Sequence, residues 1–244
     1  MSKDIKRGYV PTDEKEFNSV SCEQLYEAGA DLYYLLNRGY KIKGASVFVG
    51  NHFMLSERQR LALVRGVSPK EQLAIRKEKE ITGSIENSIV NIDGFNTIIT
   101  LEVALSDSLL IKCMDGTIRD LAALRGTYRV IEKTQLAIQY LGEVLEKEKI
   151  KKAVFYLDAP VSNSGRLKTK IMEVLQSFFF EVEVQVIPNV DSVLEKLENV
   201  ITSDAIILDR CKSFINVNEK IIRENLKKEP TMNFQDRYKP DELK

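Results

Sequence analysis

Residues 88–102 read SIVNIDGFNTIITLE, and this stretch decides the fold expected for the chain. Its apolar first part is typical of a buried strand that ends at Asp93, and a helix is expected from Asn96 to about Ser106. A lone carboxylate is costly to bury. An acid at the carboxyl end of such a strand therefore needs a partner, which is either the free amides of the next helix or a cation.

Strands and helices alternate after this stretch. Further strands are predicted at 108–114, 152–158, 181–187 and 199–202, and further helices at 132–149, 164–178, 190–199 and 216–225. This alternation predicts an α/β fold with a mostly parallel central sheet and helices on both faces.

The amino-terminal part of the chain has a different pattern and is expected to be a small, mainly helical region. Apolar residues near helical spacing predict a helix over 21–40, and Ser56 and Ser68 are expected to cap two more. The glycine-flanked stretch 43–55 is expected to be β-prone. The expected division is a helical region at 1–82, an α/β domain at 83–226 and a polar tail, frayed or docked, at 227–244.

The bulk composition is ordinary for a soluble globular protein. The 244 residues are 43% hydrophobic and 30% charged, and the formal net charge is zero. No apolar run approaches the roughly 20 residues of a membrane span, and the start of the sequence is unlike a secretory signal. A cytoplasmic protein without a membrane partner is therefore expected. The chain also lacks the strong basic field that announces many nucleic-acid binders.

The scarcity of histidine and cysteine narrows the chemistry. His52 is the single histidine, so a three-histidine metal site is impossible and a Ser-His-Asp triad would depend on it alone. Cys22, Cys113 and Cys211 are far apart in sequence, which argues against a disulfide framework and against a zinc cluster. Carboxylates, hydroxyls, amides, lysine and arginine must supply any chemistry.

Acidic residues recur where the predicted strands end. They are Asp93, Asp115, Asp120, Asp158, Asp191 and Asp204. The carboxyl ends of parallel strands meet at one edge of the sheet, where ligands of open α/β sheets collect. Clustered carboxylates raise one another's pKa, so such a group needs protons or a cation.

The cation that suits oxygen ligands alone is Mg²⁺ or Mn²⁺. Candidate catalytic residues and metal ligands are Asp93, Asp158, Asp191 and Asp204, with Asp115 and Asp120 as further candidate ligands and Asn96, Thr202 and Ser203 as supporting groups. A water activated there can attack a phosphodiester, which makes metal-assisted phosphodiester hydrolysis the leading prediction. Helix capping explains each acid taken alone.

Two polar stretches are candidate phosphate contacts. In SNSGRLKTK, residues 162–170, Ser164, Arg166 and Lys168 lie at an expected helix N-terminus, whose free amides favour an anion. In RDLAALRGTYR, residues 119–129, the candidates are Arg119 and Arg125, and the nearby Tyr128 is a candidate for stacking on a base. Turn chemistry and surface charge explain both stretches equally.

Basic residues also recur along the amino-terminal helices. They are Arg58, Arg60, Arg65, Arg76, Lys77 and Lys79. A solvated helix face explains this pattern, and an electrostatic footprint for a phosphate backbone is the alternative.

Four pieces of the sequence carry a resemblance to a known family. They are NIDGFN at 91–96, VFYLDAP at 154–160, VIPNVDSVLE at 186–195 and VITSDAIILD at 200–209. In this order they resemble the PIN-like nuclease superfamily, most closely its NYN branch, over about residues 86–212. The whole chain also resembles a prokaryotic family of uncharacterised proteins with a helical region before a PIN-like one.

The resemblance implies a metal-dependent endoribonuclease that acts on single-stranded or structured RNA. The matching acids that would hold Mg²⁺ or Mn²⁺ are Asp93, Asp158, Asp191 and Asp204, with Asn96 and Ser203 beside them. The sequence departs from the family pattern in two places. Residues 108–129 are an insertion, so Asp115 and Asp120 have no secure counterpart, and only Glu195 represents the additional acid that the branch often has near Asp191.

Other functions remain open. A catalytically inactive PIN-like module would bind RNA or a protein, and the amino-terminal helices are the expected surface for a protein partner or a homodimer. An unrelated metal-dependent phosphatase is a further alternative. CMDGTIRD at 113–120 is similar to the haloacid-dehalogenase motif, but Cys113 replaces its nucleophilic Asp. Neither 43–51 nor 162–170 has the glycine-lysine spacing of a P-loop.

Overall fold

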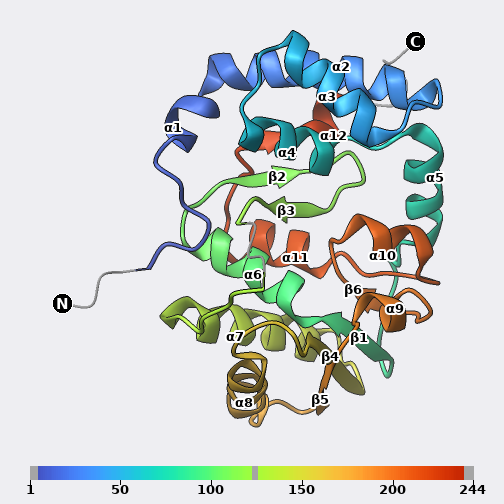
Figure 1. Cartoon of the computed structure of the whole chain (residues 1–244). Coiled ribbons are helices and arrows are strands. Elements are labelled where there is room, and N and C mark those ends of the chain that lie inside the picture. Colours follow the sequence, from blue (N-terminus) through green and yellow to red (C-terminus); the bar gives the residue numbers. More distant parts are fainter. Residues whose placement is uncertain (1–4, 123–125, 239–244) are drawn as a thin grey trace.

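The main sheet is built around β1 (Ile89–Asp93). In the computed structural model, which describes residues 5–122 and 126–238, this sheet has the order β5-β4-β1-β6 and all its strand pairs are parallel. Its other strands are β4 (Lys152–Asp158), β5 (Glu181–Ile187) and β6 (Val200–Ile201). The predicted α/β class with a parallel sheet is therefore confirmed (Figure 1).

Helices cover both faces of the main sheet. Alternate side chains of β4 point to opposite faces, so they pack in two different cores. Phe155 and Leu157 pack in one core with α6 (Gly94–Leu105), α7 (Glu132–Lys147) and α8 (Ser164–Leu175). Val154 and Tyr156 pack on the other side with α9 (Asp191–Leu194) and α10 (Ala205–Arg210). Burial on both faces explains the unbroken apolar run of this strand.

A second, smaller sheet contains the strand that was expected at 108–114. β2 (Leu110–Lys112) pairs antiparallel with β3 (Ile118–Asp120) and parallel with β7 (Met232–Asn233). Asp115 and Asp120 therefore do not lie at the edge of the main sheet, which corrects their expected position. The apolar run at 108–114 correctly predicted a strand, but a local pattern does not indicate which sheet a strand joins.

The amino-terminal region is helical, as expected. Its helices are α1 (Asp13–Glu16), α2 (Ser19–Asn37), α3 (Ile42–His52), α4 (Glu57–Gly66) and α5 (Lys70–Lys79). The expectation of a β-prone segment at 43–55 is wrong. Ala45 and Val49 are buried while Val47 and Phe48 are exposed, which is the period of a helix packed on one side.

Only one of the two expected serine caps forms. Ser56 begins α4 with a capping box, in which its hydroxyl accepts from the Gln59 amide and the Gln59 side chain accepts from the Ser56 amide. Ser68 does not cap α5, because its hydroxyl accepts a hydrogen bond from the Arg76 guanidinium at 2.9 Å.

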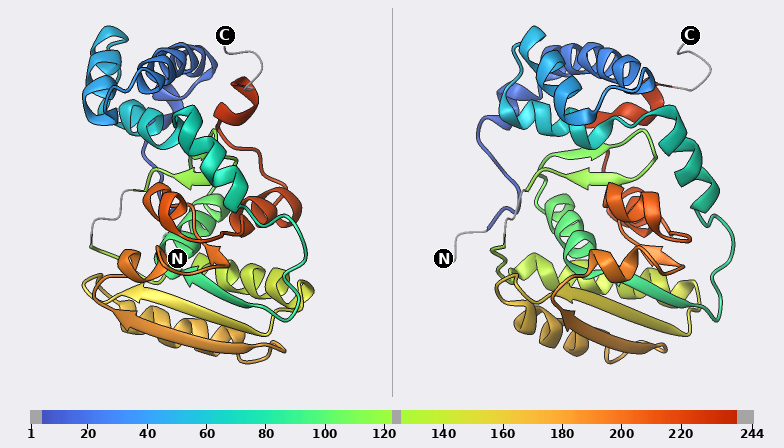
Figure 2. Two further views of the ribbon diagram at one scale, coloured as in Figure 1. Left: turned by 90° about the vertical axis from the view of Figure 1, so that its right-hand side faces the viewer. Right: turned by 45° about the vertical axis from the view of Figure 1, so that its right-hand side comes forward.

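The end of the chain is docked rather than frayed as far as residue 238. After α11 (Val217–Lys220) and the π-helical turn η1 (Ile221–Asn225), the chain forms β7 and α12 (Phe234–Arg237). Phe234 and Tyr238 are buried in one core with α2, α4 and the β2–β3 hairpin. Figure 2 shows the small sheet between the amino-terminal helices and the main sheet. The expected boundaries at 82 and 226 thus separate segments that pack together.

No helix in the ranges 5–122 and 126–238 combines the length and the apolar character needed to cross a membrane.

Docking of the carboxyl-terminal segment can be tested with Phe234→Ala. The Phe234 ring is fully buried and packs edge-on against Tyr26, with the ring centroids 5.5 Å apart. Its removal is expected to lower the free energy of unfolding by about 3–5 kcal/mol in a denaturant titration. Phe179→Ala is the control, because that side chain is 95% exposed, and it should change stability by less than about 0.5 kcal/mol. Equal effects of the two variants would contradict the docking.

Candidate functional site

Each strand of the main sheet brings one acidic residue to the same edge. β1 ends at Asp93 and β4 ends at Asp158, Asp191 begins α9 after β5, and Asp204 caps α10 after β6. Their charges act on one another: after burial, which is the larger cause, Asp204 and Asp191 raise the pKa of Asp93, and Asp204 and Asp158 raise the pKa of Asp191. We call these four residues the acid edge.

Asp93 is the buried member of the acid edge, with 7% of its surface exposed. Burial is the main cause that raises its pKa to about 7, and Asp204 and Asp191 add to the increase. The Thr202 hydroxyl donates to Asp93 at 2.8 Å, while the capping contact from the Asn96 amide is long, at 3.4 Å. Capping therefore accounts for only a small part of the placement of Asp93.

The turn Thr202–Ser203–Asp204 is tied to β1 and α6. The Asn96 side-chain oxygen accepts from both the amide and the hydroxyl of Ser203, each at 2.9 Å. The Thr202 hydroxyl accepts from the Asp204 amide at 3.0 Å while it donates to Asp93. The structure thus brings the three expected supporting residues together beside Asp93.

Asp204, Asp158 and Asp191 keep carboxylate oxygens available to a ligand. Asp204 accepts from the amides of Ile206 and Ile207 through one oxygen, and within residues 5–122 and 126–238 the Asp158 side chain accepts only from the Val190 amide, at 3.3 Å. Burial raises the pKa of Asp158. Burial, then Asp204, Asp158 and Glu195, raise the pKa of Asp191, which is exposed and has no hydrogen bond to its side chain within the described ranges.

The acid edge differs from the buried acids Glu102 and Asp115 in having no basic partner in the part of the chain that the structure describes. Glu102 forms an ion pair with Arg7 at 2.7 Å, and Asp115 forms ion pairs with Arg76 at 2.7 Å and Arg119 at 2.6 Å. Burial would raise the pKa of Asp115, but the two arginines outweigh it and lower the pKa below its usual value. In residues 5–122 and 126–238, no lysine or arginine forms an ion pair with a member of the acid edge.

A fully coordinated divalent ion has no ready-made site in the described part of the chain, whereas a hydrated ion needs fewer carboxylates. Among the described residues, no three His, Cys, Asp or Glu side chains are grouped so that they would hold one ion directly. Magnesium usually keeps several of its waters and takes one or two carboxylates from the protein. Asp93 and Asp204, whose charges act on one another, are the candidates for those carboxylates, and Asp158 and Asp191 are partly or fully exposed to water.

Several expected site residues have other roles. Asp115 pairs with two arginines, and Asp120 accepts from the Thr100 hydroxyl at 2.9 Å. Arg119, an expected phosphate contact, is buried and donates instead to the Ser203 carbonyl at 2.6 Å, to Asp115 and to the Arg65 carbonyl. Its donors are therefore used within the protein. Arg125 lies outside the described residues.

Tyr128 is also unsuited to the role expected of it. Its ring is 1% exposed, and its hydroxyl donates to Glu102 at 2.7 Å. A base cannot stack on a ring that the protein already covers.

The expected phosphate contacts on α8 are exposed and lie on the side of the acid edge. α8 follows β4 through a short connection in which Asn163 is left-handed, with φ 62°. Arg166 and Lys168 are exposed near the start of the helix, and Ser164 is partly exposed. These three residues remain candidates for contact with a phosphate.

The arginines of the amino-terminal helices lie neither on a freely solvated face nor free to contact a phosphate backbone, whereas Lys77 is exposed as a solvated face predicts. Arg76 is buried, and Arg58 and Arg60 donate to Asp13 and to backbone carbonyls such as Gly50 O. Most of these guanidiniums hold the protein together. Sequence reasoning missed this role because the acceptors lie far away along the chain.

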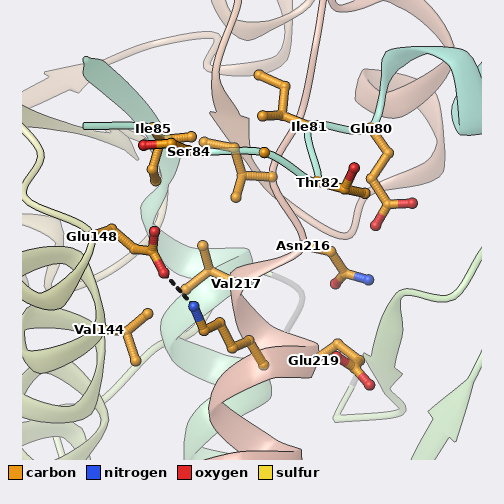
Figure 3. A pocket seen from close by; sticks show the side chains of 13 residues that line it. Glu80, Ile81, Thr82, Ser84, Ile85, Val144, Glu148, Asn216, Val217 and Glu219 are labelled. Carbon is orange, nitrogen blue, oxygen red and sulfur yellow. Dashed lines mark hydrogen bonds and ion pairs between the residues drawn. The ribbon is translucent and has the colours of Figure 1, made fainter. Parts of the chain in front are cut away.

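A cavity of about 430 Å³ lies at the other edge of the main sheet, where the amino ends of its strands are. Residues 80–85, the end of α7 and α11 line it, and Glu148 pairs with Lys220 across it (Figure 3). No member of the acid edge lines this cavity, so it belongs to a different part of the molecule.

Two family models match the chain. A domain of unknown function, DUF5616, matches residues 82–220, and a protein of unknown function, DUF434, matches residues 24–79. An uncharacterized protein of Methanocaldococcus jannaschii is 38% identical over 183 residues, which cover 75% of this chain and 88% of that protein. No solved structure matches. Because the larger match spans more than half of the chain and contains the whole acid edge, the chain belongs to the DUF5616 family.

Proposed function

We propose that the protein is a PIN-like, metal-dependent endoribonuclease that hydrolyses RNA in the cytoplasm. One observation carries the proposal. Asp93 is buried beside other acids without a basic partner among the described residues, whereas Glu102 and Asp115 each have an arginine. Burying an uncompensated carboxylate is costly, and a divalent cation is the partner that would remove this cost.

Asp93 and Asp204 would hold the Mg²⁺ or Mn²⁺ ion. When bound, such an ion polarises a phosphoryl oxygen and lowers the pKa of a water. Asp158 and Asp191 have raised pKa values, caused first by burial, which suit a group that accepts a proton from the attacking water. Asn96 holds the Ser203 amide and hydroxyl and so fixes the turn before Asp204.

Substrate contacts would come from the start of α8. The exposed Arg166 and Lys168 supply positive charge beside an acidic site, and free amides at a helix N-terminus favour a phosphate. Neighbouring phosphates of an RNA strand would lie there while one phosphodiester reaches the acid edge. This arrangement favours a polymeric substrate over a small phosphate ester.

A non-catalytic PIN-like module that binds RNA or a protein is the second candidate. It is favoured by the absence of a direct three-ligand group among residues 5–122 and 126–238, and by the capping contacts of Asp204. Such a module would bind no divalent ion at the acid edge. Metal binding therefore separates the two candidates.

Cleavage should depend on both the metal and the acid edge. The purified protein is expected to cut a mixture of single-stranded and structured RNA in Mn²⁺ or Mg²⁺ and to stop in EDTA. Asp93→Asn and Asp204→Asn should each slow cleavage by about 100-fold or more, because each removes a charged ligand. Asp31→Asn, on the exposed surface of α2, is the matched control and should keep full activity. Equal cleavage by all four proteins would point to a contaminating nuclease.

The raised pKa of Asp93 predicts a pH-dependent stability in metal-free protein. Burial raises the pKa of Asp93 in the folded state from its ordinary value of 3.8 to about 7, so the contribution of its proton to stability is complete at low pH. It is lost as the pH rises from about 4 to about 7, with a slope of up to about 1.4 kcal/mol per pH unit, and the loss levels off above pH 7. Denaturant titrations from pH 5 to 8 should show this fall, and Asp93→Asn should reduce it.

Divalent metal should oppose that fall, because it binds the deprotonated carboxylate. Mn²⁺ is expected to raise the unfolding midpoint of the wild-type protein more at pH 8 than at pH 5.5, and to leave that of Asp93→Asn unchanged. The same Mn²⁺ effect in both proteins would place the bound metal elsewhere.

A further inference from the structure

The turn that contains Asp204 is held from outside the main sheet. Arg119, on β3 of the small sheet, donates from Nε to the Ser203 carbonyl at 2.6 Å. The same guanidinium donates to the Arg65 carbonyl of α4 and to the Asp115 carboxylate at 2.6 Å. Arg119 is 6% exposed, so water competes little with these contacts.

Arg76 holds the next segment in a similar way. From α5 it donates to Asp209 and to Asp115, both at 2.7 Å, and more weakly to the Ala205 carbonyl at 3.5 Å. Lys79, one turn later, donates to the Asp209 carbonyl at 2.6 Å. Helix α10 is therefore attached to α5 near its start, at Ala205, and near its end, at Asp209.

The hydrogen bonds form one continuous chain from Asp115 to Asp93. Arg119 links Asp115 to the carbonyl of the Ser203–Asp204 peptide. The amide of that same peptide donates to the Thr202 hydroxyl at 3.0 Å, which donates to Asp93 at 2.8 Å. Both polar atoms of one peptide group are thus fixed, and this peptide orients the backbone of Asp204 relative to Asp93.

We propose that Arg119 is a positioning residue for the acid edge, and that the helical region acts with it through Arg76. The inference rests on the proposed function, since its consequence is that Arg119 sets the metal affinity of Asp93 and Asp204 without touching the metal or the RNA. The inserted β2–β3 hairpin and the amino-terminal helices are then parts of the active site's support.

Arg119→Lys tests the proposal in the full chain. Lysine keeps the positive charge near Asp115 but cannot donate to Asp115, the Ser203 carbonyl and the Arg65 carbonyl together. Arg7→Lys is the matched control, because Arg7 is also buried, at 8% exposed, and pairs with Glu102 at 2.7 Å, but its hydrogen bonds do not reach the turn. Both variants are expected to lose stability.

Two measurements are made on each variant at a temperature where it is folded. Calorimetric titration with Mn²⁺ alone should show an affinity about 10- to 100-fold weaker in Arg119→Lys and unchanged in Arg7→Lys. Hydrogen exchange read by mass spectrometry should be faster over residues 203–207 in Arg119→Lys only, because the amides of Asp204, Ile206 and Ile207 are bonded within this turn. Unchanged exchange there, or equal effects in both variants, would overturn the proposal.

The two arms separate failure of the positioning role from failure of the proposed function. If wild-type protein shows no Mn²⁺ binding that Asp93→Asn removes, the nuclease proposal fails, and hydrogen exchange alone decides the role of Arg119. If Mn²⁺ binds but Arg119→Lys binds it as wild type does, the positioning role fails and the nuclease proposal stands. Should Arg119→Lys not fold, Arg76→Lys tests the second part of the proposal, because Asp115 keeps Arg119 as a partner while the contacts of α5 with Asp209 and the Ala205 carbonyl are weakened. Faster exchange over residues 205–209 and weaker Mn²⁺ binding are then expected, and unchanged exchange there would overturn the role of the helical region.

Discussion

Parallel pairing of β1 with β4 on one side and β6 on the other is the constraint on which the acid edge depends. Ile92 pairs with Ile201, so Asp93 and Thr202 reach the same edge of the sheet, while β4, whose Tyr156 is opposite Asp93, runs two residues further to Asp158. Asp93 then lies beside Thr202, which donates to it. A shift of this pairing by one residue would turn Asp93 toward the other face.

The buried acids of this protein lie in two kinds of environment. Glu102 and Asp115 are paired with arginines, and their charges stabilise contacts between segments that are far apart in the sequence. Asp93 has a hydroxyl and a weak amide contact, and its pKa is raised to about 7, chiefly by burial. An acid left in this state at the carboxyl ends of parallel strands is typical of a site that binds a ligand.

The two matched family regions are not independent bodies in the structure. The DUF5616 match contains the β2–β3 hairpin, which packs with the helices of the DUF434 match, and the segment after residue 220 completes the same small core. Asp115 lies where these parts meet, paired with Arg76 from one match and Arg119 from the other. Removing one member of a buried ion pair leaves an uncompensated charge, so these regions are expected to fold together.

The sequence by itself determined the features that depend on local pattern. The apolar runs ending at Asp93 and Asp158 predicted parallel strands and the edge at which their acids meet, because the direction of a parallel strand fixes where its end lies. Tertiary structure alone decided which sheet the strand at 110–112 joins, that most of 43–55 belongs to a helix ending at His52, and that Arg119 donates to Ser203 rather than to a phosphate. Those outcomes depend on partners distant in sequence, for which a single chain carries no local signal.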